Sequence, residues 1–175
     1  MTYAGSLPFN PNRYAGSLHI VREGEDDCDG ERFRLGGDEV VLRVTSAESG
    51  GDVLALEVRI PAGGGPPALH RHAPAETYRV EHGELAIYRE DGAGGVERTL
   101  AGPGAVVHIP GGREHTVRNE SGAEAAAYVT FTPGAPMEGF IRAAATLGDA
   151  PMEEVLAVAA RHGVALTRPV PAPPG

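Results

Sequence analysis

Hydrophobic and polar residues alternate with a period of two through much of the chain. Between 53 and 60, for example, Leu54, Leu56, Val58 and Ile60 alternate with other side chains, and 40–45 repeats the pattern. Such alternation predicts strands with one buried face and one exposed face. Glycine and proline interrupt it at short intervals, which predicts further strands at 76–81, 84–90, 96–101, 105–109, 114–118 and 124–132. Many short, evenly spaced strands favour an all-β sandwich, barrel or jelly roll.

The pattern changes after Pro133, where apolar residues recur at helical spacing. Pro136 and Pro151 stand where first-turn prolines belong, and Gly163 suits the position that follows a helix end. We expect two short amphipathic helices that pack on the barrel or on a partner subunit. Their apolar positions are Met137, Phe140, Ile141, Ala144 and Leu147 in the first, and Met152, Val155, Leu156 and Ala159 in the second.

The length of 175 residues is that of one domain. The chain contains 25 glycines and 15 prolines, and this many helix-breaking residues argue against a helical bundle. We divide the chain into an N-terminal arm (1–15), a barrel (16–133), a C-terminal helical segment (134–165) and a flexible, proline-rich tail (166–175).

Charge and cysteine content exclude several functions. The net charge is −9 and no basic stripe is visible, so we expect no nucleic-acid partner. No apolar run approaches the roughly 20 residues that span a bilayer, and the first residues do not resemble a secretory signal, so we expect a cytoplasmic protein without a membrane partner. Cys28 alone supports neither an intramolecular disulfide nor a multi-cysteine zinc module.

The candidate chemistry lies in the histidines. In a strand, His70 and His72 would point to the same side, with Glu76 four residues further on and His115 downstream. Three imidazoles and a carboxylate suit one divalent transition metal, such as Fe, Mn, Ni, Cu or Zn, and are poor ligands for calcium. We interpret the other four histidines as structural or surface residues, although His108 could point inward: His19, His82, His108 and His162.

Two spaced motifs contain these residues, and together they resemble the cupin family. The first is Gly64-x5-His70-x-His72-x3-Glu76-x6-Gly83, and the second is Gly104-x5-Pro110-x-Gly112-x2-His115-x3-Asn119. The resemblance implies a double-stranded β-helix (a jelly-roll cupin barrel) with two short C-terminal α-helices. It also implies one metal ion held by His70, His72, Glu76 and His115, with Asn119 in a structural role.

The helical C-terminus resembles quercetin-dioxygenase-like single-domain cupins, which implies an oxidoreductase acting on a small, aromatic or polyphenolic molecule. Glu76 and Tyr78, which share strand parity, are the candidate catalytic residues. The same ligands would equally serve a non-oxidative isomerase, cyclase or lyase, or a barrel that only binds a small molecule. The aliphatic residues expected by parity to line the pocket are Leu54, Leu56, Val58, Val80, Leu85, Ile87 and Val129.

Open jelly rolls expose edge strands, which proteins tend to cover. Since cupins commonly do so by dimerising, we expect a homodimer, with residues 8–22 as a candidate pairing segment.

Overall fold

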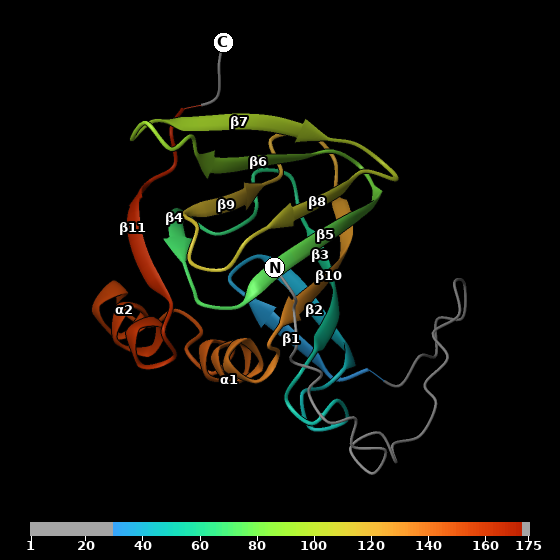
Figure 1. Ribbon diagram of the computed structural model, residues 1–175, viewed down its shortest axis with the longest axis vertical. Coiled ribbons are helices and arrows are strands. Elements are labelled where there is room, and N and C mark those ends of the chain that lie inside the picture. Colours follow the sequence, from blue (N-terminus) through green and yellow to red (C-terminus); the bar gives the residue numbers. More distant parts are fainter. Residues whose placement is uncertain (1–29, 173–175) are drawn as a thin grey trace, which may run out of the picture.

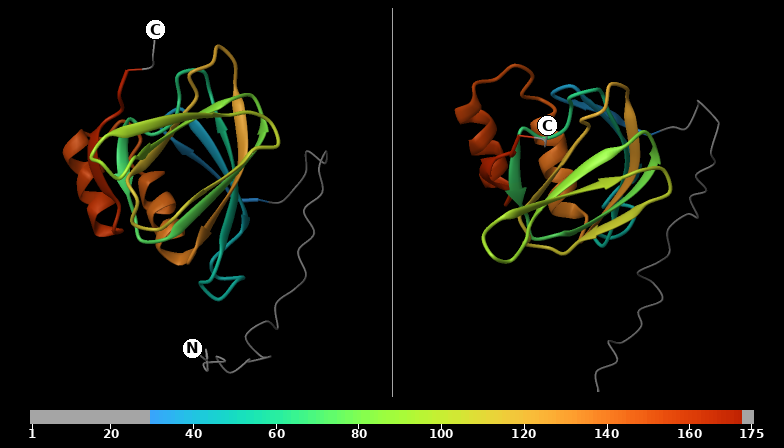
Figure 2. Two further views of the ribbon diagram at one scale, coloured as in Figure 1. Left: turned by 45° about the horizontal axis from the view of Figure 1, so that its top comes forward. Right: turned by 90° about the horizontal axis from the view of Figure 1, so that it is seen from above.

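The computed structural model describes residues 30–172, in which two antiparallel sheets face each other and two helices lie at one end (Figures 1 and 2). One sheet has the strand order β1-β2-β3-β10-β5-β8, and the other has the order β11-β4-β9-β6-β7. The strands are β1 (Arg32–Leu35), β2 (Asp38–Val44), β3 (Leu54–Ile60), β4 (Ala68–Arg71), β5 (Ala75–His82), β6 (Leu85–Glu90), β7 (Val96–Ala101), β8 (Val106–Ile109), β9 (His115–Arg118), β10 (Ala125–Thr132) and β11 (Ala165–Pro169). The predicted all-β jelly roll with two C-terminal helices is confirmed. The predicted arm, Cys28 and the candidate pairing segment lie outside the described residues.

Alternation along the strands places the core between the two sheets. In β3, Leu54, Leu56, Val58 and Ile60 are buried, whereas Arg59 is exposed. β10 lies between β3 and β5, and its inward side chains pack against both neighbours. The inward residues of the alternating pattern therefore form one apolar layer that the two sheets share.

The eight strands predicted from alternation are all present, and each boundary lies within two residues of its expected position. Turn residues explain this accuracy. Gly83, between β5 and β6, has φ +71°, and a Cβ there would lie 2.7 Å from the Cα of Ala125. Only glycine tolerates both the positive φ and the close approach of Ala125, so the sequence alone predicts a turn at this position.

The two helices are α1 (Ala135–Ala144) and α2 (Met152–Arg161). Pro136 stands in the first turn of α1, while Pro151 is the N-cap of α2, and Gly163 follows the helix end with φ +73°. α1 lies across one end of the barrel against β1 and β3, and α2 lies outside it against α1 and β11 (Figure 2). Two apolar positions of α2, Met152 and Leu156, are exposed rather than packed on the barrel.

A buried carboxylate fastens α1 to the barrel. Glu138 accepts hydrogen bonds from the backbone N–H of Ser46 (2.6 Å) and from Arg142 Nε (2.9 Å). Burial raises the pKa of Glu138, but these hydrogen bonds outweigh it and hold the pKa below its ordinary value. The helix is thus held in place by a charge that stays ionised at neutral pH.

The predicted flexible tail is wrong for residues 166–169, because Ala165–Pro169 form β11. This strand pairs with β4, and Thr167 Oγ1 donates to the carbonyl of Leu69 at 3.0 Å. Arg168 donates through Nε (2.8 Å) and Nη2 (2.5 Å) to Glu114 Oε2, directly before β9. A short segment with a proline has no strand pattern of its own, and its partner lies about a hundred residues earlier.

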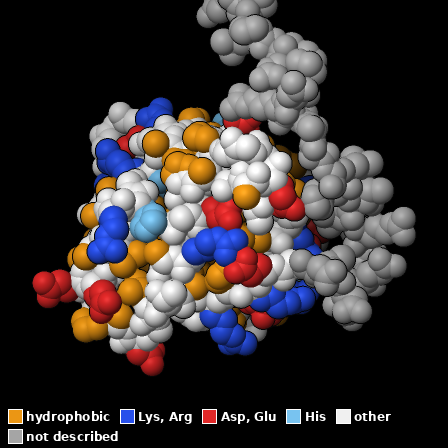
Figure 3. All heavy atoms as spheres, turned by 90° about the horizontal axis from the view of Figure 1, so that it is seen from below, with side chains coloured by type: hydrophobic (Ala, Val, Ile, Leu, Met, Phe, Trp, Pro, Cys, Tyr) orange, Lys and Arg blue, Asp and Glu red, His pale blue; other side chains and the backbone are white. Residues whose placement is uncertain are grey.

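The face seen from below in Figure 3 mixes hydrophobic, acidic and basic side chains, with no continuous area of one sign. Among the described residues, no helix has both the length and the apolar character that a membrane span requires.

We expect Arg168→Ala to lower the free energy of unfolding by about 1–2 kcal/mol, because it leaves the buried Glu114 carboxylate without its main partner. Burial raises the pKa of Glu114, but Thr167 and Arg168 outweigh it and lower the pKa from 4.5. Such a carboxylate stabilises the fold above its unfolded-state pKa. The difference between variant and parent should therefore shrink as the pH falls below 4.5.

Urea unfolding across this pH range measures the effect. The matched control is Arg89→Ala, which removes an exposed ion pair with Glu97 and should cost less than about 1 kcal/mol. Equal losses in the two variants would contradict the assigned role of β11.

Candidate metal centre

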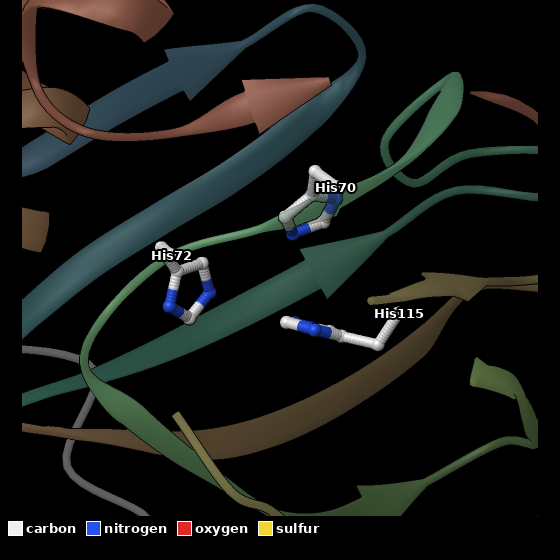
Figure 4. Close-up of side chains that lie close together, drawn as sticks. All are labelled: His70, His72 and His115. Carbon is white, nitrogen blue, oxygen red and sulfur yellow. The ribbon is translucent and has the colours of Figure 1, made fainter. Parts of the chain in front are cut away.

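Pairing of β4 with β9 brings two histidines face to face. His70 and His115 are register partners in this antiparallel pair, and their ring centroids lie 4.6 Å apart. Both rings project from the second sheet toward the interior of the barrel (Figure 4). Residues 45 positions apart in the chain thus share one site, as the sequence predicted.

His72 completes the cluster from a loop. β4 ends at Arg71, so His72 lies just beyond the strand rather than within it, yet its ring turns to the same side as that of His70 (Figure 4). One nitrogen from each of His70, His72 and His115 lies within 4.8 Å of the others. This three-histidine cluster is consistent with a divalent metal site.

Backbone carbonyls orient each imidazole. The Nδ1 atoms of His70, His72 and His115 lie 3.3, 3.0 and 2.8 Å from the carbonyl oxygens of Ala68, Pro74 and Arg113, respectively. A carbonyl only accepts hydrogen bonds, so each Nδ1 carries a proton and donates it. In the neutral ring, Nε2 is then left with a free lone pair, which is the form that ligates a metal.

Glu76 approaches the cluster from the opposite sheet. It lies on β5, is buried, and places Oε2 2.9 Å from His115 Nε2 and 3.3 Å from His72 Nε2. His72 Nε2 is itself buried and has no hydrogen-bond partner. Neutral imidazoles would turn lone pairs toward this carboxylate, and a cation among them relieves the repulsion. The donor set therefore fits a divalent metal ion.

The carboxylate and the imidazoles shift one another's pKa values. Burial raises the pKa of Glu76, but the hydrogen bond from His115 and the nearby imidazoles of His115 and His72 outweigh it and hold the pKa well below its usual range. Burial lowers the pKa of His115, but the hydrogen bond and charge of Glu76 outweigh it, so the net shift is upward. Burial and the neighbouring His115 lower the pKa of His70 to about 4. Glu76 is thus ionised and His70 neutral at neutral pH.

Tyr78 lies two residues beyond Glu76 on the same face of β5, as strand parity predicts, and it is buried. Burial raises the pKa of Tyr78 well above its ordinary value, and the charge of Glu76 and a hydrogen bond to it add to the shift. The phenol therefore stays protonated and acts as a hydrogen-bond donor beside the ionised carboxylate.

A cavity of about 120 Å³ opens beside His70 and His72, and Glu76 and Tyr78 also line it. Of the residues expected to line it, Leu56, Val58 and Val129 do so, whereas the others are core residues elsewhere: Leu54, Val80, Leu85 and Ile87. The alternation along a strand predicts which side chains point into the barrel, but it does not predict how far along the barrel axis each of them lies.

Sequence reasoning missed several residues that line this cavity, among them three from α1 and one acidic residue. Met137, Phe140 and Ile141 reach it from α1, and Asp38 reaches it from the start of β2. Asp38 Oδ1 accepts the backbone N–H of Gly65 at 3.1 Å, and burial raises its pKa. The helical spacing had marked α1 as amphipathic, but nothing in the sequence distinguished Asp38 from other acidic residues.

The remaining described histidines lie away from the cluster. The rings of His82 and His108 contact Glu124 and Thr77, and His162 caps the end of α2. His19 lies outside the described residues. Asn119 is structural, as expected, since its fully buried amide donates to the carbonyls of Ile60 (2.8 Å) and Ala123 (2.7 Å).

A jelly roll of two antiparallel sheets with a histidine cluster on its inner wall is the architecture of the cupin class. Residues 56–131 match the family model described as the cupin domain, and this range contains all three histidines and Glu76. Over this range, which is less than half of the chain, the protein is similar to the cupin domain.

Solved structures of oxalate decarboxylase have the same fold. The enzyme from Bacillus subtilis at pH 4.6 is 20% identical with a TM-score of 0.54, and the match covers 71% of this chain and 32% of that one. A mutant of the B. subtilis enzyme is 21% identical with a TM-score of 0.53, covering 61% of this chain and 28% of that one. The chain thus spans about a third of these proteins' length. No curated protein matches it.

We expect the His115→Ala variant to lose bound metal, because a ligand set reduced from three imidazoles to two binds divalent ions far more weakly. Mass spectrometry of metal content, on protein purified without chelator or metal-affinity resin, tests this. The matched control is His108→Ala, which removes an exposed imidazole outside the cluster and should retain the metal content of the parent. Equal metal content in the two variants would rule out the cluster as the site.

Proposed function

We propose that the chain is a metal-dependent cupin enzyme that acts on a small molecule, as a dioxygenase-like oxidoreductase. The observation that supports this best is the position of the three imidazoles. His70 and His72 line a cavity and the ring of His115 lies against theirs, so a ligand in the cavity would have access to a metal held by the three. A structural site would instead be closed by its own side chains.

Each residue has a distinct task in this proposal. His70, His72 and His115 would hold the metal ion, and Glu76, whose Oε2 lies 2.9 Å from His115 Nε2, would be its fourth ligand. The ion would be Fe, Mn, Ni, Cu or Zn, and it would supply Lewis acidity toward a substrate oxygen and, if redox-active, a means of reacting with dioxygen. The backbone carbonyls that accept from Nδ1 keep the rings aimed while a substrate enters.

Glu76 and Tyr78 are the proposed catalytic pair. Glu76 is ionised, and when it is off the metal and away from His115 its carboxylate would accept a proton from a substrate hydroxyl or an acidic C–H group. Tyr78 remains protonated, so it positions the carboxylate and the substrate by donating a hydrogen bond rather than by releasing its proton. The surrounding apolar side chains keep water away from this step.

The same pair favours a second candidate, a non-oxidative isomerase, cyclase or lyase. A buried carboxylate beside a phenol is an arrangement for moving protons, and it does not require dioxygen. The two candidates share the metal site and differ only in whether oxygen is consumed.

Oxygen uptake by metal-loaded protein, measured with a panel of one-ring phenols and enols, tests the proposal. We expect uptake that depends on the metal and disappears in His115→Ala. We expect Tyr78→Phe to retain its metal while turnover falls at least about tenfold, because it loses only a hydrogen-bond donor.

The outcomes separate the candidates. Product formation without oxygen uptake would replace the oxygenase with the non-oxidative enzyme. Saturable binding without turnover on any compound would mean that the barrel only binds its ligand. Protein that retains no metal, even after soaking in each of the five ions, would overturn both enzymatic candidates.

A further inference from the structure

The cavity beside the histidine cluster has one polar corner, and its other walls are apolar. The polar corner is formed by two of the histidines together with Glu76, Tyr78 and Asp38. The remaining lining residues are hydrophobic and come from β1–β3, β9, β10, α1 and the loop before β4. Any ligand that reaches the cluster therefore lies with its far end against hydrocarbon.

Helix α1 supplies the wall at that end. Met137, Phe140 and Ile141 all line the cavity, and Ile141 and Met137 are buried. Phe131, from β10, lies beside the cluster, with its ring centroid 5.8 Å from that of His72. Two phenyl rings thus flank the space, which favours flat or aliphatic groups there.

No arginine is among the lining residues of this cavity in the described part of the chain, which contains no lysine. The ionisable groups other than the histidines and Tyr78 are the carboxyls of Asp38 and Glu76. The nearby Arg118 is occupied, because its guanidinium donates to the carbonyl of Gly65 at 2.6 Å. A second negative charge on a ligand, distal to the cluster, would meet no cation among the lining residues and would lie unpaired against hydrocarbon.

The cavity also limits size. Its volume is about 120 Å³. A dry protein cavity of roughly 150 Å³ holds a benzene molecule. The space here is somewhat smaller but is not closed on every side, so it takes a short aliphatic chain or one small ring whose edge reaches the opening, and a fused or multi-ring molecule exceeds it.

We infer that the cavity selects a small alcohol, enol or phenol whose oxygen lies at the histidine end and whose remainder is uncharged and apolar, and that it excludes dicarboxylates and other ligands with a distal anion. The inference rests on the proposed function in one respect: it assumes that a substrate reacts at the end of the cavity beside the histidine cluster. It adds a substrate class, and it assigns α1, through Phe140, the task of setting specificity.

Isothermal titration with 4-methylphenol and 4-hydroxybenzoate tests the inference. The two compounds present the same phenol and differ at the far end, where one carries a methyl group and the other a carboxylate. We expect 4-methylphenol to bind at least about 100-fold more tightly, because the carboxylate would be buried without a partner. The preference should hold in both metal-free and zinc-loaded protein, since the far wall is the same in each.

Phe140→Ala checks that the binding site is this cavity. Phe140 is half-buried, so the variant should fold, and we expect 4-methylphenol to bind about 5- to 10-fold more weakly because part of the apolar wall is gone. The matched control is Leu156→Ala, which removes an exposed hydrophobic side chain on α2 and should leave the affinity unchanged.

Binding of 4-hydroxybenzoate as tightly as 4-methylphenol would overturn the inference, and so would equal affinities for 4-methylphenol in Phe140→Ala and Leu156→Ala. Failure of the proposed function looks different. In that case 4-methylphenol binds with the expected preference, but no compound is turned over. Conversely, turnover of a dicarboxylate would leave a metal-dependent enzyme in place and remove the substrate class.

Discussion

The site depends on how the imidazole rings are held. Each Nδ1–H of the cluster is committed to a carbonyl oxygen within two residues of its own histidine, so the three rings have little rotational freedom. The Nε2 atoms of His72 and His115 then lie beside the ionised Glu76 in the buried interior of the barrel. Donor atoms aimed at one buried point in this way are satisfied by a cation bound there or, in the case of His115, by a hydrogen bond to Glu76.

Both sheets and a loop are needed to assemble this arrangement. The second sheet contributes His70 and His115 through the pairing of β4 with β9, and the first sheet contributes Glu76 and Tyr78 from β5. A slip of one residue in either sheet would turn these side chains to the outer face. The C-terminal segment supports the same geometry from outside, because β11 pairs with β4 and Arg168 holds Glu114 next to His115. The helix α1 closes the cavity that the cluster faces.

Most of the fold and the ligand set could be predicted because their signals are local. Alternation located the strands, and Gly83 located a turn that no other residue would tolerate. The spacing of His70, His72 and His115 indicated a shared site, and parity placed Tyr78 inward. What failed depended on distant contacts. β11 was expected to be a tail because its strand character comes from β4, and Leu54, Val80, Leu85 and Ile87 were expected at the cavity because parity does not report depth.

The sequence by itself determined which groups are able to bind a metal and on which face of their strands they lie, since residue type and period-two spacing are properties of a short stretch of chain. Only the tertiary structure decided what surrounds those groups. The carbonyls that orient the imidazoles, the carboxylate brought from the opposite sheet, Asp38 and the apolar wall from α1 all depend on segments that meet only when the two sheets close. The charge and volume of the cavity and its exclusion of water depend on these contacts, because a cavity exists only between elements that have already packed.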